Sequence, residues 1–514
     1  MVELSGQDLT IEQVVAVARN GEPVGDLPQV ARGRMQASRT WIEDAIRKDA
    51  APIYGVTTGF GPLAQVRIQP EQTRRLSRNL ILSSMAGVGP ALPIDIVRAM
   101  LLIRVNTFAR GLSGVRPRLA DALIRMLNSG VTPYVPAKGS LGASGDLAPL
   151  AHIAAVLSKD PDQPGDSDSG RAWFGGELLS GAEAMQRAGI ERVVLEAKEG
   201  LGLTNGTNFM AAAAALGVYD AENLLRHAEL AAALSFEALL GITSALDERL
   251  HQANGQPGQV AVAGSLRRLL SGSRLVNSRP GQVQDAYSLR CTPQVLGPVR
   301  DVLVFLRERV TGAINAAADN PLFFEDSGAI SGGNFHGQGL AMWLDLLGIA
   351  VAQLGTISER RTFRMTTPEL SEGLPSMLLP NAGLDSGLMM PQYTAAALVS
   401  DNKTLAHPDS VDSIPSSANQ EDHVSMGANA ARHALEILDN VRQILAVELL
   451  TAAQAIDLRP EGPSRLGRGT AAAHRCLRQT VSFLEHDRPL SPDLEALAEL
   501  ISSDQLLKAV EDEP

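Results

Sequence analysis

Apolar residues recur at intervals of three and four positions over most of the chain, which is the spacing of amphipathic helices. The first half carries segments of moderate length, at residues 10–19, 28–49, 71–84, 93–110, 117–129 and 147–157. The second half carries longer ones, at residues 206–247, 297–318, 337–362, 387–406, 424–456, 465–485 and 491–511. The pattern predicts a mainly all-α protein.

The segment 206–247 is the longest and contains two alanine runs and no proline. Alanine is the strongest helix former, so the segment predicts one very long helix, or two helices joined at a slight kink. The other long segments also hold few charges, and a helix that is apolar on most sides must be buried on most sides. We therefore expect a bundle of long helices that is extended by subunit association.

Helical spacing is interrupted at residues 51–67, 172–203 and 279–295, where short strands would fit. Residues 159–170 are polar and rich in helix breakers, and are predicted to form a surface loop. No repeat of fixed period is visible. The expected domains are an N-terminal domain with two loops of functional interest, a central bundle of long helices, and C-terminal accessory helices, at residues 1–200, 201–460 and 461–514.

Composition narrows the functional classes. The 514 residues are 45% hydrophobic and 20% charged but only 4% aromatic, so small and branched aliphatic side chains must fill the core. A net charge of −12 argues against nucleic acid as a partner, because phosphate binding requires a basic surface. The two cysteines, Cys291 and Cys476, are too few and too distant for a disulfide framework, which favours a reducing compartment.

Neither an N-terminal signal segment nor an apolar run long enough to span a membrane is apparent, so a cytoplasmic location is expected. The nine histidines include no His-x-x-x-His pair with an intervening glutamate, and no cysteine cluster is present, so no metal site is expected. A Gly-x-Ser-x-Gly nucleophile motif, a phosphate loop and a dinucleotide fingerprint are also lacking.

The most informative stretch is the glycine-rich segment Gly139–Leu150. If its backbone bends tightly, the unhindered nitrogen of Gly145 can attack the carbonyl carbon of Ala143. Loss of water from that ring and from Ser144 leaves an electron-poor exocyclic alkene. A simpler interpretation is a loop that ends at Asp146, the cap of the following helix. For an isolated Ala-Ser-Gly tripeptide the simpler interpretation would be preferred.

Further motifs extend the match well beyond that tripeptide. They are Tyr54-Gly55-Val56-Thr57-Thr58-Gly59-Phe60-Gly61, Asn205-Gly206-Thr207, Gln284-Asp285-Ala286-Tyr287-Ser288-Leu289-Arg290-Cys291, Asp319-Asn320-Pro321-Leu322 and Ser417-Ala418-Asn419-Gln420-Glu421-Asp422-His423-Val424-Ser425-Met426. In this order, and across residues 50 to 460, the chain resembles the aromatic amino acid ammonia-lyase and aminomutase family. Histidine ammonia-lyases are relatives of this length.

The resemblance implies a prosthetic group, 4-methylidene-imidazol-5-one (MIO), that forms autocatalytically from Ala143, Ser144 and Gly145 without an external cofactor. It also implies the helical architecture of the fumarase and aspartase superfamily, and a homotetramer with shared active sites. The expected partner is a small amino acid substrate, with neither nucleic acid nor membrane involved.

The remaining reaction step removes a proton from the substrate β-carbon, which requires a positioned base. Tyr54 is the candidate, because a tyrosine in a glycine-flanked loop can close over a substrate. Alone, it would be read as an ordinary half-buried loop tyrosine. Asn205 can donate to the prosthetic ring oxygen or to the substrate. By resemblance, Tyr287 completes the catalytic set.

A guanidinium fork matches a carboxylate, so Arg290 is the candidate for the substrate carboxylate, although an isolated arginine more often forms a structural ion pair. By resemblance, Gly61, Gln284, Phe335 and Gln420 also line the site. Residues 319–322 are interpreted as a turn that ends a helix.

The residues expected to recognise the substrate side chain do not all match one type of relative. Glu421 and Met389 resemble the histidine type of relative, in which the matching glutamate contacts the substrate side chain. Ser84, however, stands where histidine ammonia-lyases carry a histidine that recognises this side chain. The pair Ser83-Ser84 also matches neither the tyrosine nor the phenylalanine type, and a serine leaves room for a larger ring.

The leading hypothesis is elimination of ammonia from an aromatic L-α-amino acid, of the histidine, tyrosine or phenylalanine class, to give a conjugated acrylate. A 2,3-aminomutase that returns the ammonia to the β-carbon is the first alternative. A helical scaffold in which Ser144 never reacts is the second. The substrate, the balance of lyase and mutase, and a catabolic or biosynthetic role are left open.

Overall fold

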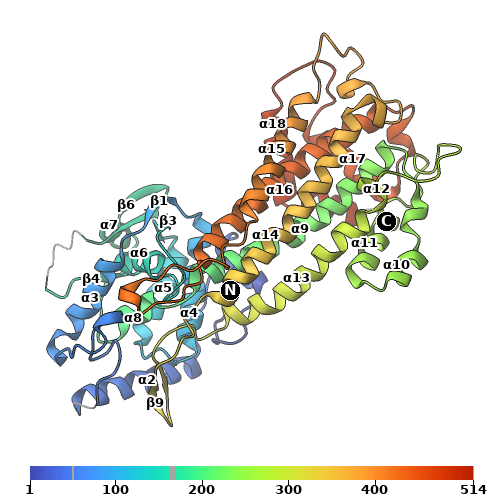
Figure 1. Cartoon of the computed structure of the whole chain (residues 1–514). Helices are drawn as coiled ribbons and strands as arrows, with labels where there is room; N and C mark the ends of the chain where they lie inside the picture. Colours follow the sequence, from blue (N-terminus) through green and yellow to red (C-terminus); the bar gives the residue numbers. More distant parts are fainter. Residues whose placement is uncertain (49–50, 163–167, 513–514) are drawn as a thin grey trace. The chain divides into compact units, whose positions relative to one another are not determined.

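The computed structural model describes residues 1–48, 51–162 and 168–512. It is mainly helical with a few short strands, as the sequence predicts (Figure 1). Packing divides the chain into two compact units that interleave in sequence. Unit 1 comprises residues 1–219, 307–345 and 408–432, and unit 2 comprises residues 220–306, 346–407 and 433–514. The division into three consecutive domains stays a prediction.

Unit 1 contains the shorter helices of the N-terminal half. They are α1 (Ile11–Ala18), α2 (Gln29–Arg47), α3 (Thr73–Ser84), α4 (Ile94–Ala109), α5 (Pro117–Ser129), α6 (Leu147–Leu157), α7 (Gly181–Arg187) and α8 (Glu199–Thr204). Helix α1 begins with a capping box, in which Thr10 and Gln13 each satisfy a backbone N–H of the other. The predicted end of the second helix at residue 49 lies outside the described residues.

The strands of unit 1 form small ribbons. Strand β1 (Val88–Ala91) pairs antiparallel with β3 (Pro136–Lys138), and β4 (Ser158–Lys159) pairs parallel with β7 (Val193–Val194). A three-stranded sheet has the order β2 (Thr132–Pro133), β5 (Arg171–Phe174), β6 (Glu177–Ser180). Strands β8 (Leu322–Phe324) and β9 (Gly328–Ile330) form a hairpin after the cis Asn320–Pro321 bond. These ribbons position loops and do not form a central sheet.

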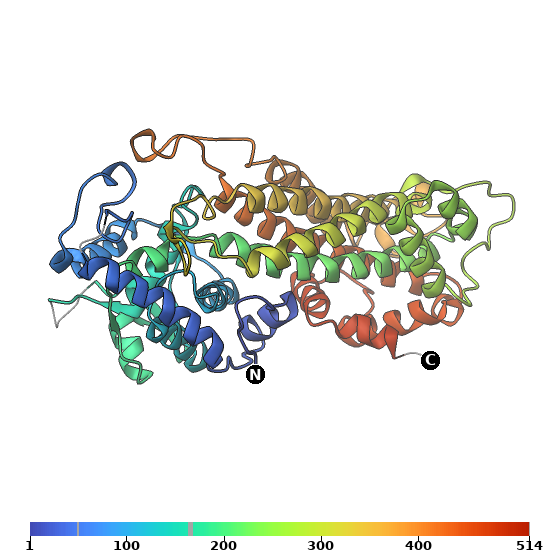
Figure 2. The same ribbon diagram turned by 90° about the horizontal axis from the view of Figure 1, so that it is seen from below.

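The long helices are α9 (Asn208–Ala238), α13 (Thr292–Ile314), α14 (Gln338–Thr366) and α16 (Gly427–Asp457), and they run side by side within unit 2 (Figures 1 and 2). Glycines allow the close approach of α14 to α16, since a Cβ at Gly355 would lie 2.9 Å from Ile444. Where three of these helices meet, Arg361 and Glu448 form a fully buried ion pair, and Ser235 donates to the same carboxylate. Removing one partner would leave the other charge buried and unpaired.

Unit 2 is completed by α10 (Glu248–Asn254), α11 (Pro257–Leu269), α12 (Tyr287–Arg290), α15 (Met389–Leu405), α17 (Arg468–Thr480), α18 (Ser491–Ser502) and α19 (Gln505–Glu511). The predicted strand at 279–295 is wrong, because Tyr287 to Arg290 form a helical turn. The predicted single helix at 491–511 is two helices, separated by Asp504 in a left-handed conformation. Helix α9 ends at Ala238, earlier than predicted, because Leu240 is left-handed.

In residues 51–67 the described backbone forms turns, a 3₁₀ segment at Gly61–Leu63 and an isolated bridge between Thr58 and Arg67, so the suggested strand there is wrong. Helix α14 is long and apolar enough to cross a membrane by length and composition, contrary to the sequence expectation. Its most apolar window is 61% buried inside the structure, which accords with a core helix.

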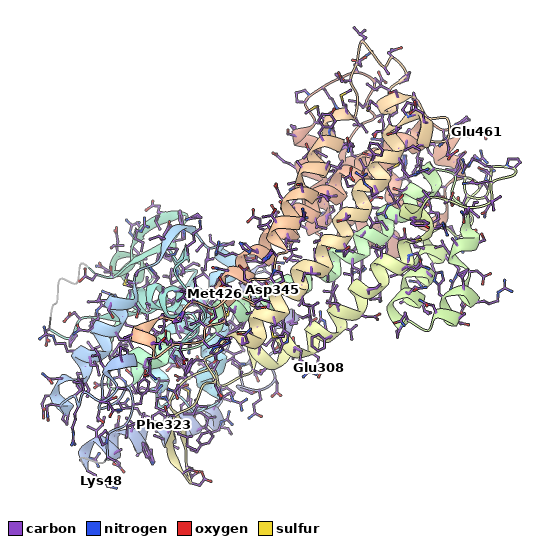
Figure 3. The ribbon with its side chains drawn as sticks, in the orientation of Figure 1. Lys48, Glu308, Phe323, Asp345, Met426 and Glu461 are labelled. Carbon is purple, nitrogen blue, oxygen red and sulfur yellow. The ribbon has the colours of Figure 1, made fainter. Side chains whose placement is uncertain are left out.

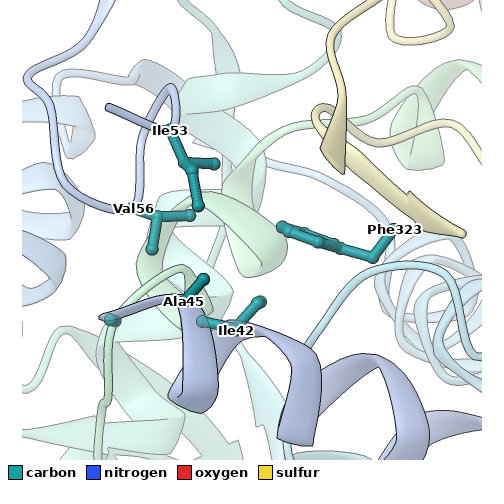
Figure 4. Packing of buried hydrophobic residues seen from close by; sticks show 6 residues of the cluster. Ile42, Ala45, Ile53, Val56 and Phe323 are labelled. Atoms are coloured by element: carbon teal, nitrogen blue, oxygen red, sulfur yellow. The ribbon is translucent and has the colours of Figure 1, made fainter. Parts of the chain in front are cut away.

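A hydrophobic cluster fixes the base of the Tyr54 loop. Ile53 and Val56 pack with Ile42 of α2 and with Phe323 of β8 (Figure 4; Phe323 is also labelled in Figure 3). Beside this cluster, Lys198 and Asp319 form a fully buried ion pair, with the ammonium nitrogen 3.0 Å from a carboxylate oxygen. The prediction that residues 319–322 end a helix is wrong, because α13 ends at Ile314 and these residues form a bend that leads into β8. Asp319 of this bend supplies the buried carboxylate.

Candidate active site

The Ser144 loop requires glycine at two positions. Gly142 has φ +68° and Gly145 has φ +72°, a region that residues with a side chain avoid. A Cβ on Gly142 would lie 2.2 Å from the Ser425 hydroxyl oxygen, and one on Gly145 would lie 2.1 Å from the Gly206 carbonyl oxygen. The loop is therefore closed on both sides by backbone and side chains from distant parts of unit 1.

Backbone hydrogen bonds hold this loop in place. The Asp146 amide donates to Gly206 (2.7 Å), the Met426 amide donates to Leu141 (2.9 Å), and the Gly337 amide donates to Gly142 (3.2 Å). Ala143 packs against Met426, which is labelled in Figure 3, and against Val424. Three sequence segments that lie far apart thus fix the candidate electrophile, as reactive backbone at a strained turn requires.

The Ser144 side chain points at a carboxylate. Its hydroxyl donates to Glu421 Oε1 at 2.5 Å, while Ser416 and Ser417 donate to Glu421 Oε2 at 2.7 and 3.1 Å. Asn205 Nδ2 donates to the Ser144 carbonyl oxygen at 3.0 Å. The buried Oδ1 of Asn205 has no hydrogen-bond partner within the described part of the chain. This amide group therefore has capacity for one more donor.

Glu421 is presented by a strained turn. Ser417, Ala418 and Asn419 have φ values of 52°, 51° and 69°, all left-handed, and the turn is closed by hydrogen bonds between Ser416 and Glu421. Each such residue costs roughly 1–2 kcal/mol unless the surrounding structure enforces it. An alanine gives no signal of this conformation in the sequence, and strain of this kind is concentrated at functional sites.

Tyr54 lies next to this turn. Its phenol oxygen accepts a hydrogen bond from the Gly61 amide at 3.1 Å. The 3₁₀ segment that begins at Gly61 packs against Ser417–Asn419, and a Cβ on Gly61 would lie 3.9 Å from Ser417 Cβ. The sequence-predicted residues Tyr54, Gly61, Glu421, Ser144 and Asn205 are therefore brought together within unit 1.

Asp146 differs from the simpler sequence interpretation. Its side chain makes no capping hydrogen bond to α6 and instead accepts the Phe209 and Met210 amides, at 2.8 and 3.1 Å, which cap α9. Complete burial raises the pKa of Asp146 to about 7, while these hydrogen bonds and Arg104 lower it. The Asp146 carboxylate therefore caps α9, and not α6, the helix that follows the loop in sequence.

Arg104 is a supporting residue that the sequence interpretation missed. It is fully buried in α4 and donates to the carbonyls of Gly202 and Asn205, at 3.0 and 3.1 Å. A Cβ on Gly206 would lie 2.5 Å from its guanidinium. Burial lowers the pKa of Arg104 to about 10. The available signal was the charge of Arg104 within the largely apolar run at residues 99–108.

Other predicted residues of unit 1 are placed less directly. Phe335 is half-buried, two residues before the Gly337 amide that binds the loop. Ser84 is half-buried at the end of α3, whereas Ser83 is exposed and donates to Leu80. The chain after them reaches the loop, because a Cβ on Gly139 would lie 3.1 Å from Gly87 Cα. The remaining predicted residue of this unit, Gln420, is exposed.

Gln284, Tyr287, Arg290 and Met389 belong to unit 2 and are described within that unit only. Tyr287 is 70% exposed, and the Arg290 guanidinium stacks 4.6 Å from its ring centre. Arg361 anchors the segment, since its guanidinium donates to the Ser288 carbonyl oxygen at 3.4 Å. Gln284 is exposed and Met389 is half-buried.

The donor set fits MIO and does not fit a metal. Asn205 donates to the carbonyl that would become part of the ring, and Gly145 has the bare backbone that ring closure requires. Among the residues that the structure describes, no group of three or more histidine, cysteine, aspartate or glutamate side chains could hold a metal ion.

Comparison with known proteins agrees with this site. The aromatic amino acid lyase family matches residues 9–479. The chain is 50% identical to histidine ammonia-lyase of Treponema denticola and 51% identical to that of Symbiobacterium thermophilum, in each case over 99% of this chain and 98% of the relative. The crystal structure of tyrosine aminomutase from Streptomyces globisporus superposes with a TM-score of 0.92 at 38% identity, covering 100% of this chain and 98% of that one.

Members of this family use an MIO group. The family match sets the scaffold hypothesis aside, and the high identity of the ammonia-lyases over the full chain favours elimination over the aminomutase alternative. The chain belongs to the aromatic amino acid lyase family and is a carbon–nitrogen lyase that eliminates ammonia from an aromatic amino acid.

Proposed function

We propose that this protein is an ammonia-lyase that converts L-histidine to the corresponding conjugated acrylate, urocanate, at an MIO group made from its own chain. The observation that carries the proposal is the Glu421 carboxylate, which accepts the Ser144 hydroxyl at 2.5 Å. A carboxylate at this distance from the electrophile suits a polar, nitrogen-bearing ring better than a hydrocarbon ring, because it can accept an imidazole N–H. The two relatives at about half identity are both histidine ammonia-lyases.

Formation of the group releases two waters. The Gly145 nitrogen bonds to the Ala143 carbonyl carbon, whose oxygen leaves as the first water. Ser144 then loses its α-hydrogen and its hydroxyl group as the second water, which leaves the alkene. The tight turn at Gly142 and Gly145 supports the first step, and the Asn205 amide supports the second, because it stabilises negative charge on the Ser144 carbonyl oxygen.

The finished group supplies an electron-poor alkene to which the substrate amine adds. Around it, Glu421 binds the substrate side chain, and Asn205 holds the ring oxygen. Tyr54 acts as the base for the β-proton, from a loop that Gly61 links to the Ser417 turn. Arg290 provides a guanidinium fork for the substrate carboxylate, which fixes its orientation.

We further propose a homotetramer in which Tyr287, Arg290, Gln284 and Met389 reach the Ser144 site of another copy. Helices α13 and α15 leave large apolar side chains in water. In unit 2, Val304 is 68% exposed, Met390 is 60% exposed and Tyr393 is 55% exposed. Apolar exposure at this density marks a surface that a protein partner covers. Tyr287, at 70%, is exposed on the same unit. A cytoplasmic location accords with the two free cysteines.

The test of the reaction is an ultraviolet time course with L-histidine, L-tyrosine and L-phenylalanine in separate samples. We expect a rising acrylate band with L-histidine, and none with Ser144→Ala. Intact mass should show the loss of two waters in the wild type and not in this variant. If only L-tyrosine reacts, the assignment of histidine is wrong, and chromatographic detection of a β-amino acid would favour the aminomutase.

Site sharing is tested by complementation. Ser144→Ala and Tyr287→Phe are each expected to be nearly inactive as homotetramers. In mixed tetramers from coexpression, some sites carry both substitutions and others carry neither. If the sites are shared between copies, we therefore expect activity to be recovered. No recovery in mixed tetramers, verified by two affinity tags, would show that each chain builds its site alone.

A further inference from the structure

A cavity of unit 2 is lined by arginine and contains no residue of the Ser144 loop among its described lining residues. Its volume is about 960 Å³, within the range of small-molecule sites. Its walls are formed by residues of helices α9, α11, α13, α17 and α19. Figure 1 labels the first four of these helices. The lining includes five arginines, which are Arg226, Arg267, Arg268, Arg300 and Arg468. Among the described residues, the lining carboxylates are Glu229 and Glu511.

Such a concentration of positive charge is unexpected on a chain with a net charge of −12. Two arginines are neutralised, since Arg300 lies 3.4 Å from Glu229 and Arg226 pairs with Glu511. The buried carboxylate of Glu229 is also hydrogen-bonded by Ser265. The two lining carboxylates therefore do not neutralise all five lining arginines, and the cavity keeps an excess of positive charge.

Two of the guanidinium groups lie close to the same glycine, Gly264. A Cβ on Gly264 would lie 3.7 Å from Arg268 Nη1 and 3.8 Å from Arg267 Nη2. Because both guanidinium groups lie close to the same point, an anion placed there would contact both of them. Arg267 is anchored by the Leu246 carbonyl at 2.6 Å and has Glu248 at 3.6 Å. The Arg268 guanidinium is exposed to solvent and interacts electrostatically with Glu229.

Helix α17 contributes a further arginine. It begins at Arg468, and Arg468 and Gly469 of its first turn line the cavity. The end of this helix is already occupied, because the Gly467 amide donates to Glu237 at 2.7 Å and the Arg468 amide donates to the Ser271 carbonyl at 2.9 Å. The Ser265 and Ser271 hydroxyls line the same space. Fork-shaped guanidinium groups with hydroxyl groups nearby are the donor set that phosphate oxygens select.

We propose that this cavity of unit 2 binds a phosphate-bearing anion at Arg267, Arg268 and Arg468. The proposal stands independently of the reaction and the substrate. The phosphate enters between the two converging guanidinium groups above Gly264, and the remaining volume accommodates the group that carries it.

The test is titration calorimetry of the purified full-length protein with inorganic phosphate, pyrophosphate and ATP in separate experiments, without divalent cations. We expect saturable binding of pyrophosphate that weakens as ionic strength rises. Tighter binding of ATP than of pyrophosphate would identify an organic phosphate as the ligand. Equal binding would identify the phosphate group alone.

Two variants locate the site by different means. Arg268→Gln removes a charge and is expected to weaken binding about tenfold. Gly264→Leu keeps all the arginines but fills the space between their tips, and is expected to abolish binding. Arg249→Gln, an 89% exposed arginine of unit 2 outside the cavity, is the charge-matched control and should bind like the wild type. Circular dichroism and melting temperature verify that each variant is folded.

Absence of binding for all three probes at millimolar concentration would overturn the proposal. So would unchanged affinity in both Arg268→Gln and Gly264→Leu, because the anion would then bind elsewhere. An equal loss of affinity in Arg249→Gln would reduce the effect to net charge, and this result also contradicts a defined site.

Discussion

The Ser144 loop and the Gln284–Arg290 segment both carry candidate catalytic residues, but the structure holds them in different ways. The loop is buried, is closed by glycines, and is bound to Gly206, Gly337 and Met426 from distant parts of unit 1. The segment is a single helical turn whose Tyr287 is 70% exposed and whose Arg290 stacks on that same ring. The comparison indicates that one group of candidate residues is built within the fold, whereas the other is presented outward.

The largest expected effect comes from crowding the loop. Gly145→Ala places a Cβ 2.1 Å from the Gly206 carbonyl oxygen, so the backbone must shift and ring closure should fail. We expect activity to fall at least about a thousandfold, the scale of losing the group that performs the chemistry. Intact mass should show that the two waters are retained.

Gly130→Ala is the matched control for this variant. Gly130 is also left-handed, at φ +77°, but a Cβ there would meet nothing within 4 Å. It should lose stability by about 1 kcal/mol while retaining activity and the two-water loss. If both variants lose activity equally, backbone strain alone, and not contact with Gly206, explains the requirement for glycine.

In the exposed Gln284–Arg290 segment, we expect a substitution to reduce activity without affecting the formation of the prosthetic group. Tyr287→Phe should reduce kcat by about a hundredfold or more, the scale of a proton-transfer group. Because the side chain is exposed, the free energy of unfolding should change by less than about 0.5 kcal/mol, and the two-water loss should be complete. Tyr393→Phe, another exposed tyrosine of unit 2, is the control for activity. A large stability loss in Tyr287→Phe would contradict an outward-presented role.

Asp146 gives the stability of the loop a pH dependence. Its folded pKa of about 7 lies above the ordinary value of 3.8, so the folded state binds the proton more tightly than the unfolded state. Stability from this group is therefore present at low pH and is lost as pH rises from about 4 to about 7, by up to about 4 kcal/mol.

Asp146→Asn should remove this slope, because the amide oxygen still accepts the Phe209 and Met210 N–H groups without ionising. The measurement is denaturant unfolding at pH 5 and pH 8, with the exposed Asp439→Asn as control. An equal pH slope in wild type and Asp146→Asn would show that Asp146 is ionised throughout, held by Arg104.

The smallest expected effect concerns specificity. Ser84→His restores the histidine expected in histidine ammonia-lyases, and should raise kcat/KM for L-histidine by up to about tenfold. Ser83→His, one residue earlier on an exposed position of α3, should have no such effect. A fall in kcat/KM with Ser84→His would mean that this serine already contacts the substrate side chain.

The sequence was sufficient for the helices that depend on local spacing. The capping box at Thr10 and the long apolar segments gave helices within a few residues, because periodicity and capping act over short stretches. Local spacing failed at residues 287–290, where a strand was expected and a helical turn formed. It also failed after Ala238, since Leu240 adopts a left-handed conformation that leucine rarely takes.

The sequence by itself also predicted the chemistry, because Ala143-Ser144-Gly145 combines a leaving hydroxyl with an unhindered nitrogen inside a longer glycine-rich motif. Tertiary structure alone decided which groups surround Ser144. Asp146 serves α9 and not its own helix, Arg104 holds the Asn205 turn, and three left-handed residues aim Glu421. The physical reason is that these contacts join residues far apart in sequence, and their cost in burial or strain is met only by the folded surroundings.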